Sequence, residues 1–159
     1  MIELKILDAR LSGDRFPQYA TDEAAAIDLR ACNIQGQDFD HVVIAPGGRV
    51  KFGAGFAVDC GAMPPSDWFK TAALVLPRSG LGSKGYVLSN LVGLIDGDYQ
   101  GEIIVTFWNA SENEFTVQQF DRIAQLMFVP VLHAPLVAVS EFSRTTQRGS
   151  GGFGSTGVA

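Results

Sequence analysis

The turn that follows an apolar run near the middle of the chain carries groups suited to binding an anion. Arg78, Ser79 and Gly80 follow the apolar residues 72–76, with Pro77 between them. An arginine fork and a hydroxyl can donate hydrogen bonds to phosphate oxygens, and glycine lets backbone N–H groups come close to them. The same residues are also typical of a tight turn with an exposed arginine, so this pattern alone leaves both interpretations open.

Carboxylates supply a second kind of chemistry. Asp96 and Asp98 flank a glycine next to Tyr99. Paired carboxylates in a loop are usually solvated turn formers, although in a cleft one of them could orient and deprotonate a water molecule. Asp28 lies between apolar residues, where a carboxylate needs either a partner or a chemical task.

Two stretches, residues 80–85 and 149–154, match the pattern GxGxxG. A dinucleotide-binding fold requires a strand before this motif and a helix after it. The first stretch is followed by strand-like residues and the second by the end of the sequence, so neither predicts a dinucleotide site. Lys84 is followed by glycine rather than Ser or Thr, which also excludes a Walker A motif.

Composition excludes several other classes of function. The chain has 159 residues, 47% of them hydrophobic, which fits one domain. A net charge of −5 argues against a nucleic-acid-binding protein. The apolar runs are too short to span a membrane, and the first residues do not resemble a secretory signal, so we expect a cytoplasmic protein. Cys32 and Cys60 are predicted to be buried reduced thiols. His41 and His133 lack metal-ligand spacing, so a metal held by histidines is not expected.

The elements that must position these groups are predicted to be short strands. The chain contains 18 glycines and 7 prolines, which favour tight turns over helices. Strands are predicted over residues 2–6, 42–45, 48–52, 56–60, 72–76, 86–95, 102–109, 115–120, 122–131 and 136–139, with Asp96-Gly97 at the tip of a hairpin. Only residues 21–31 could hold a helix. The pattern predicts an all-β sandwich, jelly roll or barrel.

The C-terminal segment differs from the rest. Residues 143–159 are rich in glycine and carry few large apolar side chains. Such a segment is typical of a disordered tail, yet its two arginines and one phenylalanine are also what a lid over a phosphorylated ring compound requires. We therefore divide the chain into a β domain over residues 1–142 and a flexible tail over residues 143–159.

Five segments of the sequence, taken together, resemble the five ordered motifs of the homotrimeric dUTPase family. They are residues 19–31, 77–85, 90–101, 121–130 and 148–157. The resemblance implies a jelly-roll-like β fold and a homotrimer with shared active sites, with no nucleic acid or membrane as partner. Residues 61–70, which include Trp68, look like an insertion.

The resemblance also implies an activity, the hydrolysis of dUTP to dUMP and pyrophosphate with Mg²⁺. Asp96 would orient and deprotonate the attacking water, and Gln125 would help to position it. Asp28 would contact waters of the Mg²⁺, which the substrate phosphates would mainly hold. The substrate-binding residues implied are Arg78, Ser79 and Gly80 for the phosphates, Asn90, Leu94, Ile95, Asp96, Tyr99 and Ile104 for uracil and deoxyribose, and Arg148, Phe153 and Gly154 in the tail.

Two alternatives remain open at this stage. The related dCTP deaminase group shares the fold, although its deaminating residues are not evident in this sequence. A non-catalytic protein that senses dUTP and binds a partner through Trp68 would share the nucleotide pocket. As a dUTPase, the protein would supply dUMP for thymidylate synthesis and keep uracil out of DNA.

Overall fold

The computed structural model describes residues 1–62 and 69–152. Its strands are β1 (Glu3–Ile6), β2 (Ile27–Arg30), β3 (Asn33–Ile34), β4 (His41–Ile44), β5 (Arg49–Asp59), β6 (Phe69–Pro77), β7 (Tyr86–Leu88), β8 (Gly93–Ile95), β9 (Glu102–Asn109), β10 (Phe115–Gln118) and β11 (Arg122–Leu132). One turn of α-helix, α1 (Ser79–Gly82), and two 3₁₀ turns, η1 (Gly13–Arg15) and η2 (Cys60–Ala62), complete the described elements.

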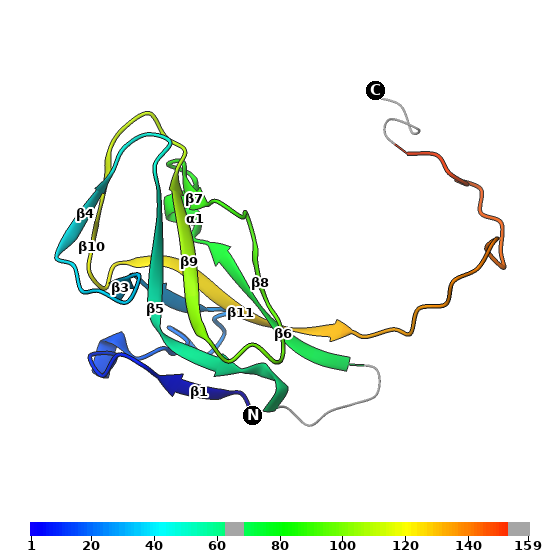
Figure 1. The fold of residues 1–159 in the computed structure, drawn as a ribbon, viewed down its shortest axis with the longest axis horizontal. Coiled ribbons are helices and arrows are strands. Elements are labelled where there is room, and N and C mark those ends of the chain that lie inside the picture. The colour runs from blue at the N-terminus through cyan, green and yellow to red at the C-terminus, as the bar shows by residue number, and fades with distance from the viewer. Residues whose placement is uncertain (63–68, 153–159) are drawn as a thin grey trace.

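Two larger sheets and a small one form the body of the molecule (Figure 1). One sheet has the order β1-β5-β9-β7, with β3 added beside β5, and the other has the order β2-β11-β6-β8. Strands β4 and β10 form a separate pair. All of these pairings are antiparallel. The prediction of an all-β, jelly-roll-like fold is confirmed.

The core is made by the inward faces of the two larger sheets. In β9, Ile103, Val105 and Phe107 are buried and alternate with more exposed neighbours. Leu29 of β2 and Leu126 of β11 join the same buried cluster from the other sheet. Each such side chain contributes about 1.5–3 kcal/mol when it is removed from water. This alternation fixes which side chains of each strand face outward, including those of the site described below.

Strand β5 differs from the prediction of two strands separated by a glycine turn. It runs unbroken through Gly53 and Gly55, and its pairing with β9 shifts register between Gly53 and Ala57. Gly55 has a φ of 76°, and its N–H donates to Glu102 Oε1 at 2.8 Å. The glycines therefore form a bulge within one long strand.

The prediction of one strand over residues 86–95 is also wrong, because this stretch divides into β7 and β8. Leu91, with a φ of 62°, makes the turn between them. Strand β7 pairs with β9, whereas β8 pairs with β6 in the other sheet. Asp96-Gly97 therefore does not form the tip of a hairpin between β8 and β9.

Two further predictions of secondary structure are wrong, and one strand was missed. Residues 21–26 form turns and bends, and β2 begins at Ile27, because burial of alternate residues in the sheet outweighs the helix propensity of the alanines. Residues 136–139 form no strand, and β3 was not predicted.

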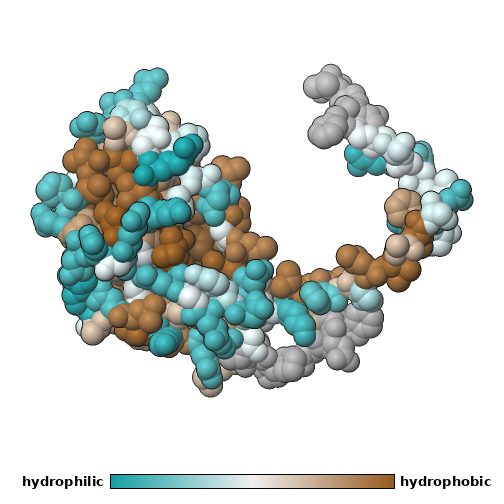
Figure 2. Space-filling model, viewed as in Figure 1, coloured by the Kyte–Doolittle hydropathy of each residue, from teal (hydrophilic) through white to brown (hydrophobic). Residues whose placement is uncertain are grey.

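We call residues 133–152 the arm. It follows β11 and leads away from the body (Figure 1). Leu136 is 96% exposed and Phe142 is 89% exposed, and apolar surface runs along this segment (Figure 2). None of the residues that the structure describes covers these apolar side chains.

Candidate active site

Three neighbouring strands bring two of the predicted site residues into one row. Gln125 of β11 lies opposite Asp28 of β2 on one side and opposite Leu76 of β6 on the other. Residues directly opposite each other on antiparallel strands project to the same face. Because Ile27 and Leu29 are buried in the core, Asp28 and Gln125 lie on the outward face of the sheet.

The Asp28 carboxylate lies between two arginines. Its Oδ1 is 3.0 Å from Arg78 Nε, and its Oδ2 is 3.2 Å from Nη1 of Arg122. The Asp28 side chain is only 26% exposed, so the two guanidinium groups replace many of the hydrogen bonds that water would otherwise make to its carboxylate. The sequence predicted either a partner or a chemical task for this carboxylate, and the structure shows two partners.

Gln125 is tied to the start of the same turn. Its Nε2 donates to the main-chain carbonyl of Pro77 at 3.0 Å. The Gln125 side chain is therefore held one residue away from Arg78, and among the described residues no partner occupies its amide oxygen.

The turn that follows β6 presents its polar groups outward. Arg78 caps α1, and its carbonyl accepts hydrogen bonds from the N–H groups of Leu81 and Gly82. Ser79 and Gly80 are exposed, and a Cβ atom added at Gly80 would have none of the described atoms within 4 Å. The end of β6 therefore offers an arginine, a hydroxyl and an uncrowded backbone on one surface.

A second group of predicted residues surrounds β8 and the loop after it. Leu94 of β8 is 62% exposed and Ile104 of β9 is 44% exposed. Asn90 lies in the turn before β8, and its Nδ2 would be 3.4 Å from a Cβ added at Gly93. Ile95 pairs with Ala73 of β6. Leu94 and Ile104 are thus apolar side chains that the described residues leave largely uncovered.

Tyr99 is fixed within this second group. Its hydroxyl donates to the carbonyl of Glu102 at 2.9 Å, and its ring lies over Gly101, where an added Cβ would come within 2.5 Å of the hydroxyl oxygen. Asp96 is exposed, its carbonyl accepts from the Tyr99 N–H at 3.2 Å, and its carboxylate has no partner among the described residues. The hydroxyl of Tyr99 is thus anchored, and the carboxylate of Asp96 is open to solvent.

The two groups lie far apart within one chain. Ile95 is opposite Ala73 and Gln125 is opposite Leu76, on the two sides of β6. From Ala73 to Leu76 is three residues along β6, or about 10 Å, and β8 and β11 are two strand spacings apart, or about 9.6 Å. Because these two directions are perpendicular, the Cα atoms of Ile95 and Gln125 are separated by roughly 14 Å. Asp96 lies one residue further away, so Asp96 and Gln125 of the same chain cannot contact one water molecule.

Arg148, the described member of the predicted tail residues, is not brought to either group. Arg148 lies in the arm, where its Nε donates to the carbonyl of Gly151 at 2.9 Å. Phe153 and Gly154 lie outside the described residues, as does Trp68.

The family to which these motifs point is decided by comparison with known proteins. The dUTPase family profile matches residues 15–157. The chain belongs to the dUTPase family. The prediction of an enzyme of this family is thereby confirmed.

Relatives and solved structures of this family resemble the chain along nearly its whole length. The deoxyuridine 5'-triphosphate nucleotidohydrolase of Legionella pneumophila is 49% identical over 99% of this chain and 97% of its own. That of Tolumonas auensis is 50% identical over 98% and 97%. A dUTPase of Staphylococcus bacteriophage 80alpha, solved with dUpNHpp, has a TM-score of 0.78 at 23% identity and covers 99% of both chains, which shows a common fold.

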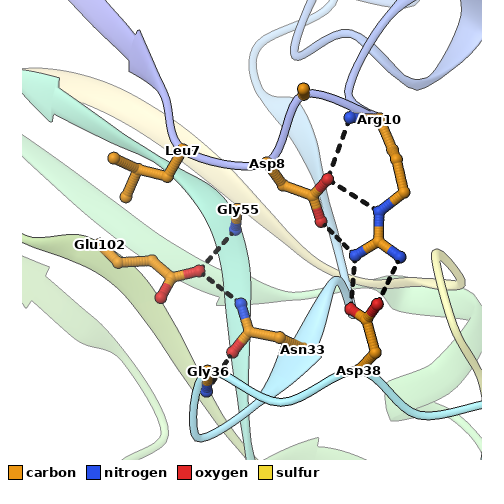
Figure 3. A pocket seen from close by; sticks show the side chains of 9 residues that line it. Leu7, Asp8, Arg10, Asn33, Gly36, Asp38, Gly55 and Glu102 are labelled. Carbon is orange, nitrogen blue, oxygen red and sulfur yellow. Dashed lines mark hydrogen bonds and ion pairs between the residues drawn. The ribbon is translucent and has the colours of Figure 1, made fainter.

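The dUTPase fold of this chain also contains a polar pocket that the sequence did not reveal (Figure 3). It measures about 380 Å³. Arg10 lies between Asp8 and Asp38, at 2.7 and 2.6 Å, and this guanidinium lowers the pKa of both carboxyl groups. Asn33 and Glu102 bond to each other at 2.8 Å. Because these side chains satisfy one another, we interpret the pocket as structural.

The side chains that the structure describes do not form a metal cage. Among the described residues, no group of three or more His, Cys, Asp and Glu side chains could hold a metal ion. A divalent ion at Asp28 would therefore need most of its ligands from a bound molecule, and a partly exposed carboxylate fits that arrangement. The described residues also include no helix long and apolar enough to cross a membrane.

One residue of the cluster, Arg122, had no predicted role. It falls within the motif at residues 121–130, but its contact with Asp28 depends on an irregularity in β11 that the sequence does not reveal.

Proposed function

We propose that the protein hydrolyses dUTP to dUMP and pyrophosphate. The observation that carries this proposal is the convergence of Asp28, Arg78 and Gln125 on one face of three strands in a chain of the dUTPase family. Phosphoryl transfer depends on positioning and electrostatic stabilisation more than on covalent chemistry. A cluster of this composition supplies both.

The turn after β6 binds the phosphates in this proposal. Arg78 donates its guanidinium fork, Ser79 its hydroxyl, and Gly80 an open approach to the backbone. Mg²⁺, when bound with the substrate, supplies further charge neutralisation. The substrate phosphates would hold the ion, and Asp28 would contact it through water. A dUTPase variant of phage phi11 of S. aureus is described with a structural Mg(II) ion.

The surface around β8 binds the nucleoside. Backbone groups of Leu94 and Ile95, together with the Asn90 side chain and Ile104, surround the uracil. A pocket that pairs with the polar edge of uracil rejects cytosine, because mismatched buried donors and acceptors remain unsatisfied. The fixed ring of Tyr99 packs against the deoxyribose and excludes a ribose 2′-hydroxyl.

The attacking water lies between the two halves of the site. Asp96 accepts its proton, and Gln125 orients it toward the α-phosphorus. Since these residues of one chain are too far apart to share a water, we propose that they come from different copies in a homotrimer. The exposed apolar arm supports this assembly, because a second copy would remove its side chains from water.

The tail forms the third part of the site. Residues 143–159 close over the bound nucleotide, with Arg148 on the γ-phosphate and Phe153 and Gly154 over the uracil. Stacking of an aromatic ring on a base contributes about 1–3 kcal/mol toward ordering this glycine-rich segment. Acting in the cytoplasm, such an enzyme supplies dUMP for thymidylate synthesis and keeps uracil out of DNA.

The test is to incubate the purified protein with Mg²⁺ and, separately, dUTP, dCTP, dTTP and UTP, and to resolve the products. We expect dUMP and pyrophosphate from dUTP alone. Asp96→Asn should abolish turnover, whereas Asp98→Asn, the exposed carboxylate of the same loop, should leave it unchanged. Ammonia from dCTP would identify a deaminase instead, and tight dUTP binding without turnover would identify a sensor.

A further inference from the structure

Strand β11 contains one extra residue beside the phosphate-binding turn. Arg122 lies opposite Arg30 of β2, but Ala124 lies opposite Leu29, so two steps on β11 match one step on β2. Ile123 is the residue between them, and both Ile123 and Ala124 are buried. This is the geometry of a β-bulge, a feature that re-aims side chains next to active sites.

The bulge decides which way Arg122 points. In a regular strand, side chains alternate, so Arg122 would share the face of Ala124 and Leu126, which are both buried in the core. The extra residue moves Arg122 to the opposite face, on which Gln125 and Asp28 lie.

Arg122 makes two different contacts on that face. Its Nη1 lies 3.2 Å from Asp28 Oδ2, and its main-chain carbonyl accepts a hydrogen bond from Arg78 Nη1 at 3.1 Å. Asp28 and Arg78 also contact each other, so the three residues form a closed triangle. Arg30, the nearest other arginine on this face, instead donates to the carbonyls of Phe120 and Asp14.

We propose that Arg122 is a positioning residue that holds the Asp28 carboxylate in place for the hydrated Mg²⁺ of the bound nucleotide, an inference that rests on the proposed function. When Arg78 donates to phosphate, its hold on Asp28 weakens, and Arg122 remains as the partner of that carboxylate. Its own side chain is 49% exposed and does not need to contact the substrate.

The role predicts a specific kinetic pattern. Arg122→Ala should lower kcat about 10- to 100-fold and raise the Mg²⁺ concentration needed for half-maximal rate, as the loss of an outer partner of a metal-binding carboxylate commonly does. Arg122→Lys should recover part of this loss, because it keeps the charge without the planar fork. The carbonyl that holds Arg78 survives both substitutions, so the KM for dUTP should change less than kcat.

A binding measurement separates this role from the others. Affinity for the imido analogue dUpNHpp, measured by calorimetry, should fall in Arg122→Ala with Mg²⁺ and stay unchanged in EDTA. Arg15→Ala is the matched control, since Arg15 is exposed and lies over the Phe120 ring at 4.3 Å, outside the site. It should match the wild type in every measurement.

Two results would overturn the proposal. One is an Arg122→Ala variant with the wild-type kcat and Mg²⁺ dependence. The other is an equal loss of analogue affinity with and without Mg²⁺, which would assign Arg122 to the phosphates themselves. If the wild-type protein releases no pyrophosphate from dUTP, the proposed function fails, and the analogue measurements still decide the role of Arg122.

Discussion

The distance between the two halves of the site can be tested by mixing two inactive variants. Asp96→Asn disables the half beside β8, and Gln125→Ala disables the half on β11. Each variant alone should be inactive. If each site takes its two halves from different chains, a mixed trimer contains some sites in which both halves are intact.

The recovered activity follows from the arrangement. In an equal mixture, an intact Asp96 comes from a Gln125→Ala chain and an intact Gln125 from an Asp96→Asn chain. Each choice has a probability of one half, so about one quarter of the sites should be complete, and the mixture should regain about one quarter of wild-type turnover. If each site lay within a single chain, the mixture would regain no turnover, because every chain carries one of the two inactivating substitutions.

The assay is pyrophosphate release after the two variants are unfolded together and refolded, so that the chains exchange. A mixture of Gln125→Ala with Arg78→Ala is the matched control. Arg78 and Gln125 lie in the same half of the site, because the Gln125 side chain bonds to Pro77, the residue before Arg78. In that mixture, every chain therefore carries a substitution in the half that binds the phosphates. Failure of the first mixture to recover activity would refute the shared site, and recovery in the control mixture would refute the assignment of Arg78 and Gln125 to one half.

Three other predictions concern the tail, the nucleoside pocket and a buried thiol. Deleting residues 147–159 should reduce turnover severely without lowering the Tm, because the described part of this segment is exposed; an unchanged rate would exclude a lid. Gly101→Ala should push the Tyr99 ring aside and reduce the preference for dUTP over UTP about tenfold, measured as the ratio of kcat/KM values; an unchanged ratio would exclude Tyr99 as the wall against ribose. Burial raises the pKa of the Cys32 thiol from its ordinary value of 9.0 to about 12. At a pH between these two values, the unfolded chain loses the thiol proton while the folded chain keeps it. The free energy of unfolding should therefore fall by about 1.4 kcal/mol per pH unit until the pH reaches the folded pKa. Urea titrations of the wild type and Cys32→Ala at rising pH should show a shallower fall in the variant, and equal slopes would contradict this assignment.

The sequence predicted those features that depend on local patterns. The run of apolar and β-branched residues over 103–108 identified β9 with its bounds. The position of Asp28 among apolar neighbours indicated a carboxylate in need of a partner, and Arg78 and Arg122 are its partners.

Features that depend on distant contacts were missed. The glycines at 53 and 55 are typical of a turn, and contacts from distant residues, such as the carboxylate of Glu102 and the backbone N–H of Cys32, stabilise them as a bulge. The division of residues 86–95 between two sheets depends on which strands are free to pair, β9 for one half and β6 for the other. For the same reason, no local pattern could reveal that Asp96 and Gln125 of one chain lie on opposite sides of β6.

The extra residue at position 123 lets β11 bury two consecutive side chains, Ile123 and Ala124, without turning Arg122 inward. Removing Ile123 would restore regular alternation with Arg122 still opposite Arg30 on the outward face, so the loss would fall on the core, which would lack the Ile123 side chain. Straightening the strand with all of its residues kept would instead turn Arg122 toward the core, where an unpaired guanidinium is costly. In the evolution of this strand, the bulge therefore lets the core gain a side chain at position 123 while the direction of Arg122 is kept.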